Sequence, residues 1–235
     1  MPRPDGRETD ALRPVVLTTG VQQDPQGSVQ IDLGRTRVLV AANVSDRVPD
    51  WLAGRGRGWI TAEYAMLPGA VPGRARRDGG GRAREIQRLI GRSLRAAFDL
   101  EALGERLITV DCDVLQADGG TRVASICAGW VAVMQAVARL ERDGALHADP
   151  RREPLAAVSC VKIDGRVVLD PNYEEDHRAE VDANLVLTHG GRLVELQATA
   201  EGAPFDDADL QRMLELARAG ATEIARHQQA ALQAP

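Results

Sequence analysis

The sequence predicts an α+β fold, in which a single domain of mixed β-sheet packs against helices. Two observations predict this class: segments that alternate apolar and polar residues occur in both halves of the chain, and three longer segments carry apolar residues at helical spacing. The chain has 235 residues, of which 44% are hydrophobic and 27% charged, and this suits one core of ordinary size. No internal repeat or linker divides it, so residues 1–235 are predicted to form one domain.

The first third of the chain is predicted to be mostly strand. A charged, polar tail covers residues 1–13, and Gly34-Arg35 supplies a turn between the first two strands. Residues 69–81 are rich in Gly, Pro and Arg and are predicted to be a flexible loop. The extended segments expected in this part are 28–32, 36–44 and 59–66.

The middle of the chain is predicted to hold two helices that flank a strand. In the first helix the apolar residues share one face, and Arg88, Arg92 and Arg95 recur on another face. A polar turn, residues 116–122, leads from the strand into the second helix. The expected elements are a helix over 82–100, a strand over 107–115 and a helix over 121–142.

The last third is predicted to be an antiparallel meander closed by a helix. Asp164-Gly165 and Gly190-Gly191 are typical hairpin turns. The final amphipathic helix is expected over 206–232, with acidic residues in its first turn. The expected strands are 157–163, 166–170, 180–188 and 192–200.

Composition excludes several classes of protein. No run of 18 apolar residues exists, so we expect no membrane span, and the polar N-terminus does not resemble a secretory signal. We therefore expect a cytoplasmic protein with no membrane partner. Cys112, Cys127 and Cys160 lie far apart, so neither a disulfide framework nor a zinc site is expected.

Charge is distributed unevenly along the chain, although the net charge is only −5. Between Arg55 and Arg95, ten arginines stand against three acidic residues, a local charge of +7. Between Asp170 and Asp209, eleven acidic residues stand against two arginines, a local charge of −9. The basic segment is a candidate surface for a polyanion, since guanidinium groups grip phosphate oxygens in pairs. A solvated arginine-rich face without a ligand is the alternative interpretation.

Two glycine runs each deliver an arginine to a predicted helix start. Residues 119–122, Gly-Gly-Thr-Arg, open the second helix, where free backbone N–H groups and the helix dipole suit an anion. The run is neither a Walker loop nor a dinucleotide fingerprint, and taken alone it is more typical of a helix cap. Residues 79–82, Gly-Gly-Gly-Arg, repeat the arrangement, so the two together suggest one shared anion.

A dense acidic run lies between Tyr173 and Asp182. Such carboxylates repel one another unless they share a cation or a proton. In one continuous strand Asp176 and Asp182 would be about 20 Å apart, so a bulge or turn must separate them for joint action. A solvated acidic loop remains the alternative. An arginine-rich anion site beside an acidic pair suits phosphoryl transfer, in which positioning and charge neutralisation do most of the catalysis.

Several ordered blocks resemble the ribonuclease PH family, the bacterial phosphate-dependent 3′→5′ exoribonucleases, over essentially the whole chain. The blocks are residues 27–29, 58–68, 81–96, 111–122, 173–182 and 197–202. The resemblance implies a fold like that of ribosomal protein S5 domain 2 and a homo-oligomer, a hexameric ring built as a trimer of dimers. It also implies trimming of tRNA precursors and other RNA 3′ ends, in tRNA and rRNA processing. Nucleoside 5′-diphosphates would be released reversibly, with inorganic phosphate as co-substrate and Mg²⁺ as cofactor.

The resemblance also implies roles for individual residues. Asp176 and Asp182 match acidic catalytic positions, where they would bind a divalent metal or supply a proton, and Arg82 is the third predicted catalytic residue. The residues that would hold phosphate are Arg82, Gly120, Thr121 and Arg122. The arginines predicted to follow the RNA backbone without reading bases are Arg55, Arg57, Arg74, Arg76, Arg77, Arg88 and Arg92.

Two other functions fit parts of this pattern. A catalytically silent ring subunit that binds RNA would be expected to lack the phosphate arginines or the aspartate pair, and all of these are present. A metal-dependent hydrolytic nuclease would use the acidic residues without phosphate. Product analysis separates the two reactions, because phosphorolysis releases diphosphates and hydrolysis releases monophosphates.

Overall fold

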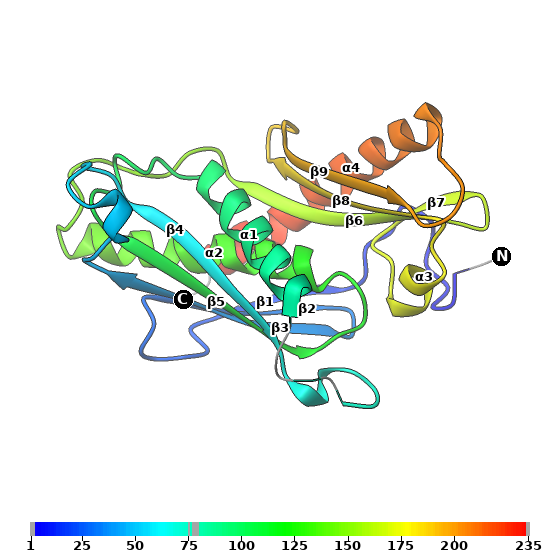
Figure 1. Cartoon of the computed structure of the whole chain (residues 1–235), viewed down its shortest axis with the longest axis horizontal. Coiled ribbons are helices and arrows are strands. Elements are labelled where there is room, and N and C mark those ends of the chain that lie inside the picture. Colours follow the sequence, from blue (N-terminus) through cyan, green and yellow to red (C-terminus); the bar gives the residue numbers. More distant parts are fainter. Residues whose placement is uncertain (1–2, 75, 77–79, 234–235) are drawn as a thin grey trace.

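The computed structural model describes residues 3–74, 76 and 80–233, and Figure 1 shows its arrangement. The fold is α+β, as predicted, and contains two sheets. The first sheet has five strands in the order β1-β2-β3-β5-β4; β4 and β5 are parallel and the other neighbours are antiparallel. Its strands are β1 Val15–Thr19, β2 Gly27–Leu33, β3 Thr36–Ser45, β4 Trp59–Met66 and β5 Leu107–Gln116.

The second sheet is antiparallel throughout and has the order β7-β6-β8-β9. Asp164 and Gly165 both have positive φ, 49° and 69°, and form the predicted tight turn between β6 and β7. The second predicted hairpin turn lies between β8 and β9, where Gly191 has φ 80°. The strands are β6 Leu155–Ile163, β7 Arg166–Leu169, β8 Val181–Thr188 and β9 Leu193–Ala200.

Helix α2 (Thr121–Arg142) lies between the two sheets and contacts strands of both. We predicted one apolar stripe, but the helix is buried on nearly all sides because it has a sheet on each of two sides. By length and composition α2 could cross a membrane, yet 78% of its apolar window is buried inside the fold, as expected for a core helix. One continuous apolar cluster connects both sheets through this helix.

The remaining helices cover the sheets or join their strands. Helix α1 packs on β4 and α2, and α4 packs on the second sheet and on β1 (Figure 1). Their bounds are α1 Gly80–Ala96, α3 Tyr173–His177 and α4 Asp207–Gln233, with single 3₁₀ turns at Asp50–Leu52 and Pro68–Ala70.

The predicted elements are present, with several differences. Helix α1 ends at Ala96 and not at residue 100, because Phe98 pairs instead with Arg151 in an isolated β-bridge. Strand β1 was not predicted, since its apolar residues do not alternate, and α3 was not predicted within the acidic run. The predicted loop 69–81 was too long at its end, because residues 80 and 81 already belong to α1; residues 75 and 77–79 lie outside the described residues.

Close contact between β2 and α2 depends on a residue without a side chain at Gly27. A Cβ at Gly27 would lie against the carbonyl oxygen of Ala132, nearer than van der Waals contact allows. We expect Gly27→Ala to separate β2 from α2 and to lower the free energy of unfolding by about 1–3 kcal/mol, measured by chemical denaturation. In the control, Gly69→Ala, a Cβ would meet nothing within 4 Å, so an equal loss there would contradict the explanation.

Candidate active site

The turn between β5 and α2, residues 118–121, leads into the N-terminus of α2, whose first backbone N–H groups have no acceptor within the helix; in the turn itself the Asp118 N–H donates to Thr36 Oγ1 at 2.9 Å. Gly119 and Gly120 have φ 77° and 71°, in the left-handed region that glycine adopts without strain. Gly120 occupies the N-cap position of α2. Because glycine has no side chain, it makes no side-chain hydrogen bond to the first N–H groups of the helix. These groups and the positive end of a 22-residue helix suit an anion such as phosphate. We call residues 118–121 the glycine turn.

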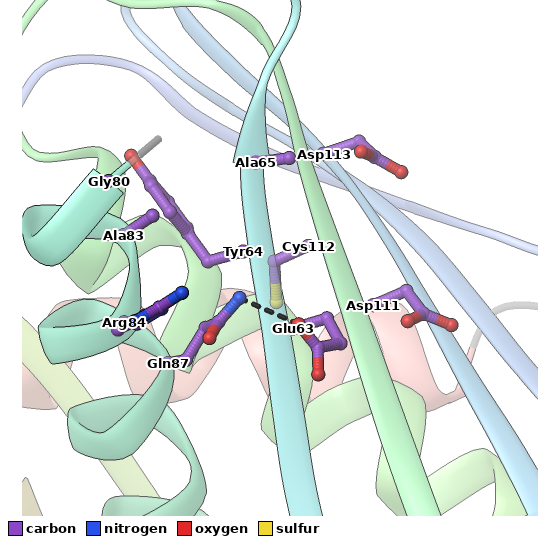
Figure 2. Close-up of a pocket in the computed structure, with 10 residues that line it drawn as sticks. All are labelled: Glu63, Tyr64, Ala65, Gly80, Ala83, Arg84, Gln87, Asp111, Cys112 and Asp113. Carbon is purple, nitrogen blue, oxygen red and sulfur yellow. Dashed lines mark hydrogen bonds between the residues drawn. The ribbon is translucent and has the colours of Figure 1, made fainter. Parts of the chain in front are cut away.

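Tyr64 lies beside the glycine turn, a contact that no feature of the sequence predicts. Its phenolic oxygen is 2.8 Å from Thr121 Oγ1, and both side chains are buried. Burial raises the pKa of Tyr64, while the charges of Arg82 and Arg122 oppose that rise. Figure 2 shows Tyr64 pointing from β4 toward the start of α1. Tyr64 therefore remains a neutral hydroxyl that can fix the rotamer of Thr121.

Arg82 and Arg122 lie in the first turns of α1 and α2, and both are close to Asp176. Burial raises the pKa of Asp176, and the charges of Arg82 and then Arg122 oppose this shift. The charges of both helix-start arginines therefore act on the same carboxylate, although 40 residues of sequence separate the arginines. Their assigned contacts with phosphate stay predictions.

The two predicted catalytic carboxylates are brought together by the turn that the spacing required. Asp176 lies in the short helix α3, which Asn172 and Glu175 cap reciprocally, and the chain then turns before β8 begins. Asp182 is the second residue of β8. Burial raises the pKa of Asp182, and the negative charge of Asp176 raises it further. This is the behaviour expected of two carboxylates that share a site.

A buried chain of hydrogen bonds holds Asp182 in place. The Asn184 amide nitrogen lies 3.2 Å from Asp182 Oδ2, and Ser159 Oγ donates to Asn184 Oδ1 over 2.8 Å. Ser159 lies on β6 and Asn184 on β8, so the sheet itself fixes both. Neither residue was predicted, because two polar side chains in alternating strands give no sign of which carboxylate they face.

Two adjoining cavities run from Asp182 along α1. The first, of about 540 Å³, includes Arg122, Asp182 and Gln197 in its lining. The second, of about 420 Å³, shares Glu85 and Gln197 with it and continues along the arginine face of α1. We call the two together the α1–β9 groove. A third cavity, of about 440 Å³, lies between α1 and the edge of the first sheet, and Figure 2 shows its lining.

Of the arginines predicted to follow RNA, Arg88 and Arg92 line the α1–β9 groove. Arg92 donates to both oxygens of Glu195 on β9 at 2.7 Å. Arg74 and Arg76 are exposed shortly before α1, and Arg77 lies outside the described residues.

Arg55 and Arg57 lie at the other end of β4 from Tyr64, which places them about 20 Å from the glycine turn along the strand. Within one subunit they are therefore not neighbours of the phosphate residues.

The carboxylate pair fits the chemistry of Mg²⁺, which binds hard oxygen ligands and often takes only one or two from the protein. Asp176 and Asp182 supply two such groups. Within the described residues, no cluster of three or more His, Cys, Asp or Glu side chains is placed to hold a metal ion.

Sequence comparison places the chain in a family. The profile of the 3′ exoribonuclease family, domain 1, matches residues 11–138, and the profile of domain 2 matches residues 153–220. These ranges contain the first and second sheets respectively. The chain therefore belongs to the 3′ exoribonuclease family.

Individual relatives agree with this membership. The chain is 52% identical to ribonuclease PH of Maricaulis maris, over 98% of this chain and 99% of that protein. It is 53% identical to ribonuclease PH of Saccharopolyspora erythraea, over 100% of this chain and 96% of that protein.

Solved structures confirm the fold at lower identity. The structure of rice Rrp46 matches with a TM-score of 0.81 at 22% sequence identity. The match covers 98% of this chain and 100% of the rice chain. A chain of the Archaeoglobus fulgidus exosome with RNA bound to the active site has a TM-score of 0.83 at 23% identity, over 95% of this chain and 91% of that chain.

The raised pKa of Asp182 predicts a gain in stability when its charge is removed. At pH values below 3.8 the carboxyl is protonated in both states, whereas above its folded pKa ionisation opposes folding. We therefore expect Asp182→Asn to raise the unfolding temperature at pH 7.5, by about 2–4 °C for each kcal/mol recovered, with the gain vanishing as the pH falls toward 4.

Asp209→Asn is the opposite control for this prediction. The hydrogen bond from Lys162 lowers the pKa of Asp209, so its ionisation favours folding and its removal should lower the unfolding temperature at pH 7.5. An unfolding temperature for Asp182→Asn at or below that of the wild type would contradict the assignment.

Proposed function

We propose that this chain is a phosphate-dependent 3′→5′ exoribonuclease that releases nucleoside 5′-diphosphates. The observation that carries the proposal is that Arg122, in the first turn of α2, and Asp182 line one cavity, while the charges of Arg82 and Arg122 act on Asp176 and that of Asp176 on Asp182. A site of that charge pattern holds an inorganic anion beside a proton donor. Identity above 50% to ribonuclease PH proteins over the whole chain supports the same function.

The reaction joins two anions, so the site must neutralise charge before bonds change. An oxygen of inorganic phosphate attacks the phosphorus of the last phosphodiester, and the bond from that phosphorus to the 3′ oxygen of the preceding nucleotide breaks. Arg82, Arg122 and the N–H groups of the glycine turn hold the attacking phosphate. One phosphate ester is exchanged for a diphosphate linkage of similar energy, so the reaction is reversible.

The departing 3′ oxygen must take up a proton, and Asp182 is suited to supply it. Burial and the charge of Asp176 raise the pKa of Asp182, so this carboxyl keeps a proton more readily than a free aspartate. The Ser159–Asn184 chain fixes the orientation of the carboxyl. In the alternative arrangement Asp176 and Asp182, both ionised, would hold Mg²⁺, and the ion rather than a proton from Asp182 would offset the charge on the departing oxygen and the phosphate.

The wider assignments rest on the family and stay predictions. They are tRNA precursors and other RNA 3′ ends as substrates, a hexameric ring built as a trimer of dimers, and localisation in the cytoplasm. The charge distribution supports an RNA substrate, because the exposed arginines of α1 continue from the phosphate residues along the α1–β9 groove.

Product analysis tests the reaction type. With a 3′-extended RNA and inorganic phosphate we expect nucleoside 5′-diphosphates by chromatography, and almost no product when phosphate is omitted. Nucleoside monophosphates formed without phosphate would instead establish a hydrolytic nuclease, and no product under either condition would favour a silent RNA-binding subunit.

In the same assay Arg82→Ala should raise the KM for phosphate about tenfold or more, because a charge-assisted contact is lost. Arg226→Ala, an exposed arginine of α4, is the control.

RNA affinity should depend on salt through the exposed arginines of α1. Arg88 makes no ion pair within the part of the chain that the structure describes, so its charge is available to a phosphate. We expect Arg88→Ala to weaken binding of single-stranded RNA and to reduce the slope of log affinity against log salt by about 0.7, measured by fluorescence anisotropy without phosphate. An unchanged slope, equal to that of Arg226→Ala, would remove Arg88 from the RNA path.

A further inference from the structure

The predicted polar tail is docked on the site through two buried arginines. Arg13 has 4% of its surface exposed, and Asp170, its partner just before α3, has 2%. Asp170 Oδ2 accepts from the Arg13 backbone N–H at 2.8 Å and from Nε at 2.9 Å, and Asp170 Oδ1 accepts from Nη2 at 2.6 Å. A buried carboxylate with three charge-assisted or backbone partners is firmly held.

The same guanidinium also holds the glycine turn. Arg13 Nη1 donates to the carbonyl oxygen of Asp118, and Nη2 lies 3.4 Å from the carbonyl oxygen of Gly119. Nη2 lies so close to Gly120 that a Cβ there would stand 3.1 Å from it. One buried side chain therefore connects the turn that opens α2 with the segment that leads into α3.

The glycine turn and the segment 170–173, which leads into α3, lie in direct contact. A Cβ at Gly119 would lie 2.6 Å from the carbonyl oxygen of Pro171, and the Tyr173 backbone N–H donates to Asp118 Oδ1 over 3.3 Å. The Arg13 charge also opposes the upward pKa shift of Asp176. A change in the position of this guanidinium would move the phosphate N–H groups relative to the carboxylates.

We infer that Arg13 is a positioning residue that sets the distance between the phosphate-binding turn and the catalytic carboxylates. The inference rests on the proposed function. Arg13 does not touch the substrates; it acts through Asp118, Gly119 and Asp170. The planar fork is required, because a lysine ammonium at this position keeps the charge but cannot reach both the carboxylate and the turn carbonyls.

Arg3 provides a matched comparison within the same tail. It has 8% of its surface exposed and donates to both oxygens of Glu175, at 2.7 and 2.9 Å. Among the described residues, none of its hydrogen bonds reaches the glycine turn. Arg3 Nη2 also donates to the Asp170 carbonyl oxygen at 3.0 Å, so loss of Arg3 removes that contact and loosens α3, while the bonds from Arg13 to the Asp170 carboxylate and to the turn remain.

The test compares Arg13→Lys with Arg3→Lys. Both substitutions should lower the unfolding temperature, since each disturbs a buried ion pair. Only Arg13→Lys should weaken the binding of inorganic phosphate, by about tenfold in the calorimetric Kd and in the KM for phosphate. Arg3→Lys should leave both constants within twofold of the wild-type values. Calorimetry with inorganic phosphate alone gives a readout that does not depend on turnover.

Two results would overturn the inference: a folded Arg13→Lys protein that binds phosphate with the wild-type Kd, or equal weakening in Arg3→Lys. If Arg13→Lys does not fold, Arg13→Gln combined with Asp170→Asn removes both buried charges together and is measured in the same way. Failure of the proposed function is separate, because it would appear as wild-type protein that releases no nucleoside diphosphate from RNA and phosphate.

Discussion

The structure depends on one constraint: a helix buried between two sheets begins at a glycine that leaves its first turn without a side-chain cap. Helix α2 is enclosed by both sheets along its length, so its axis is fixed by the core and its N-terminus has one possible position. Gly119 and Gly120 let the chain enter the helix without a side chain over the free N–H groups. The packing that stabilises the fold is thus the packing that aims these N–H groups.

Opposite charges meet across the site, although the sequence separates them. The arginine-rich segment forms the exposed face of α1, and the acidic segment supplies α3 and the start of β8. Part of this charge is paired within the protein, as in the contact between Arg92 and Glu195. Beside the glycine turn, Asp176 raises the pKa of Asp182, while the charges of Arg82 and Arg122 offset the upward pKa shift of Asp176. The same balance allows the site to accept an anionic co-substrate beside two acidic side chains.

Much of this arrangement could be predicted from the sequence, because its signals are local. Alternation, hairpin glycines and helical spacing predicted most of the strands, and α2 begins and ends at the predicted residues. The spacing of Asp176 and Asp182 required a turn between them, and the turn is present. The prediction did not include partners that meet only through tertiary structure. Nothing near Tyr64 in the sequence indicates that it reaches Thr121, and nothing in the polar tail indicates that Arg3 and Arg13 are buried.

The docked tail has a consequence for how the protein is made. Arg13 binds Asp170 across 157 residues, and Arg3 binds Glu175 across 172. The N-terminus leaves the ribosome first, but its partners are among the later residues to be synthesised. A nascent chain can form the first sheet early, yet the proposed carboxylate pair is complete only once Asp182 has been synthesised. A chain that ends before Glu175 therefore lacks both carboxylates of the proposed site, as well as the partner that holds Arg3.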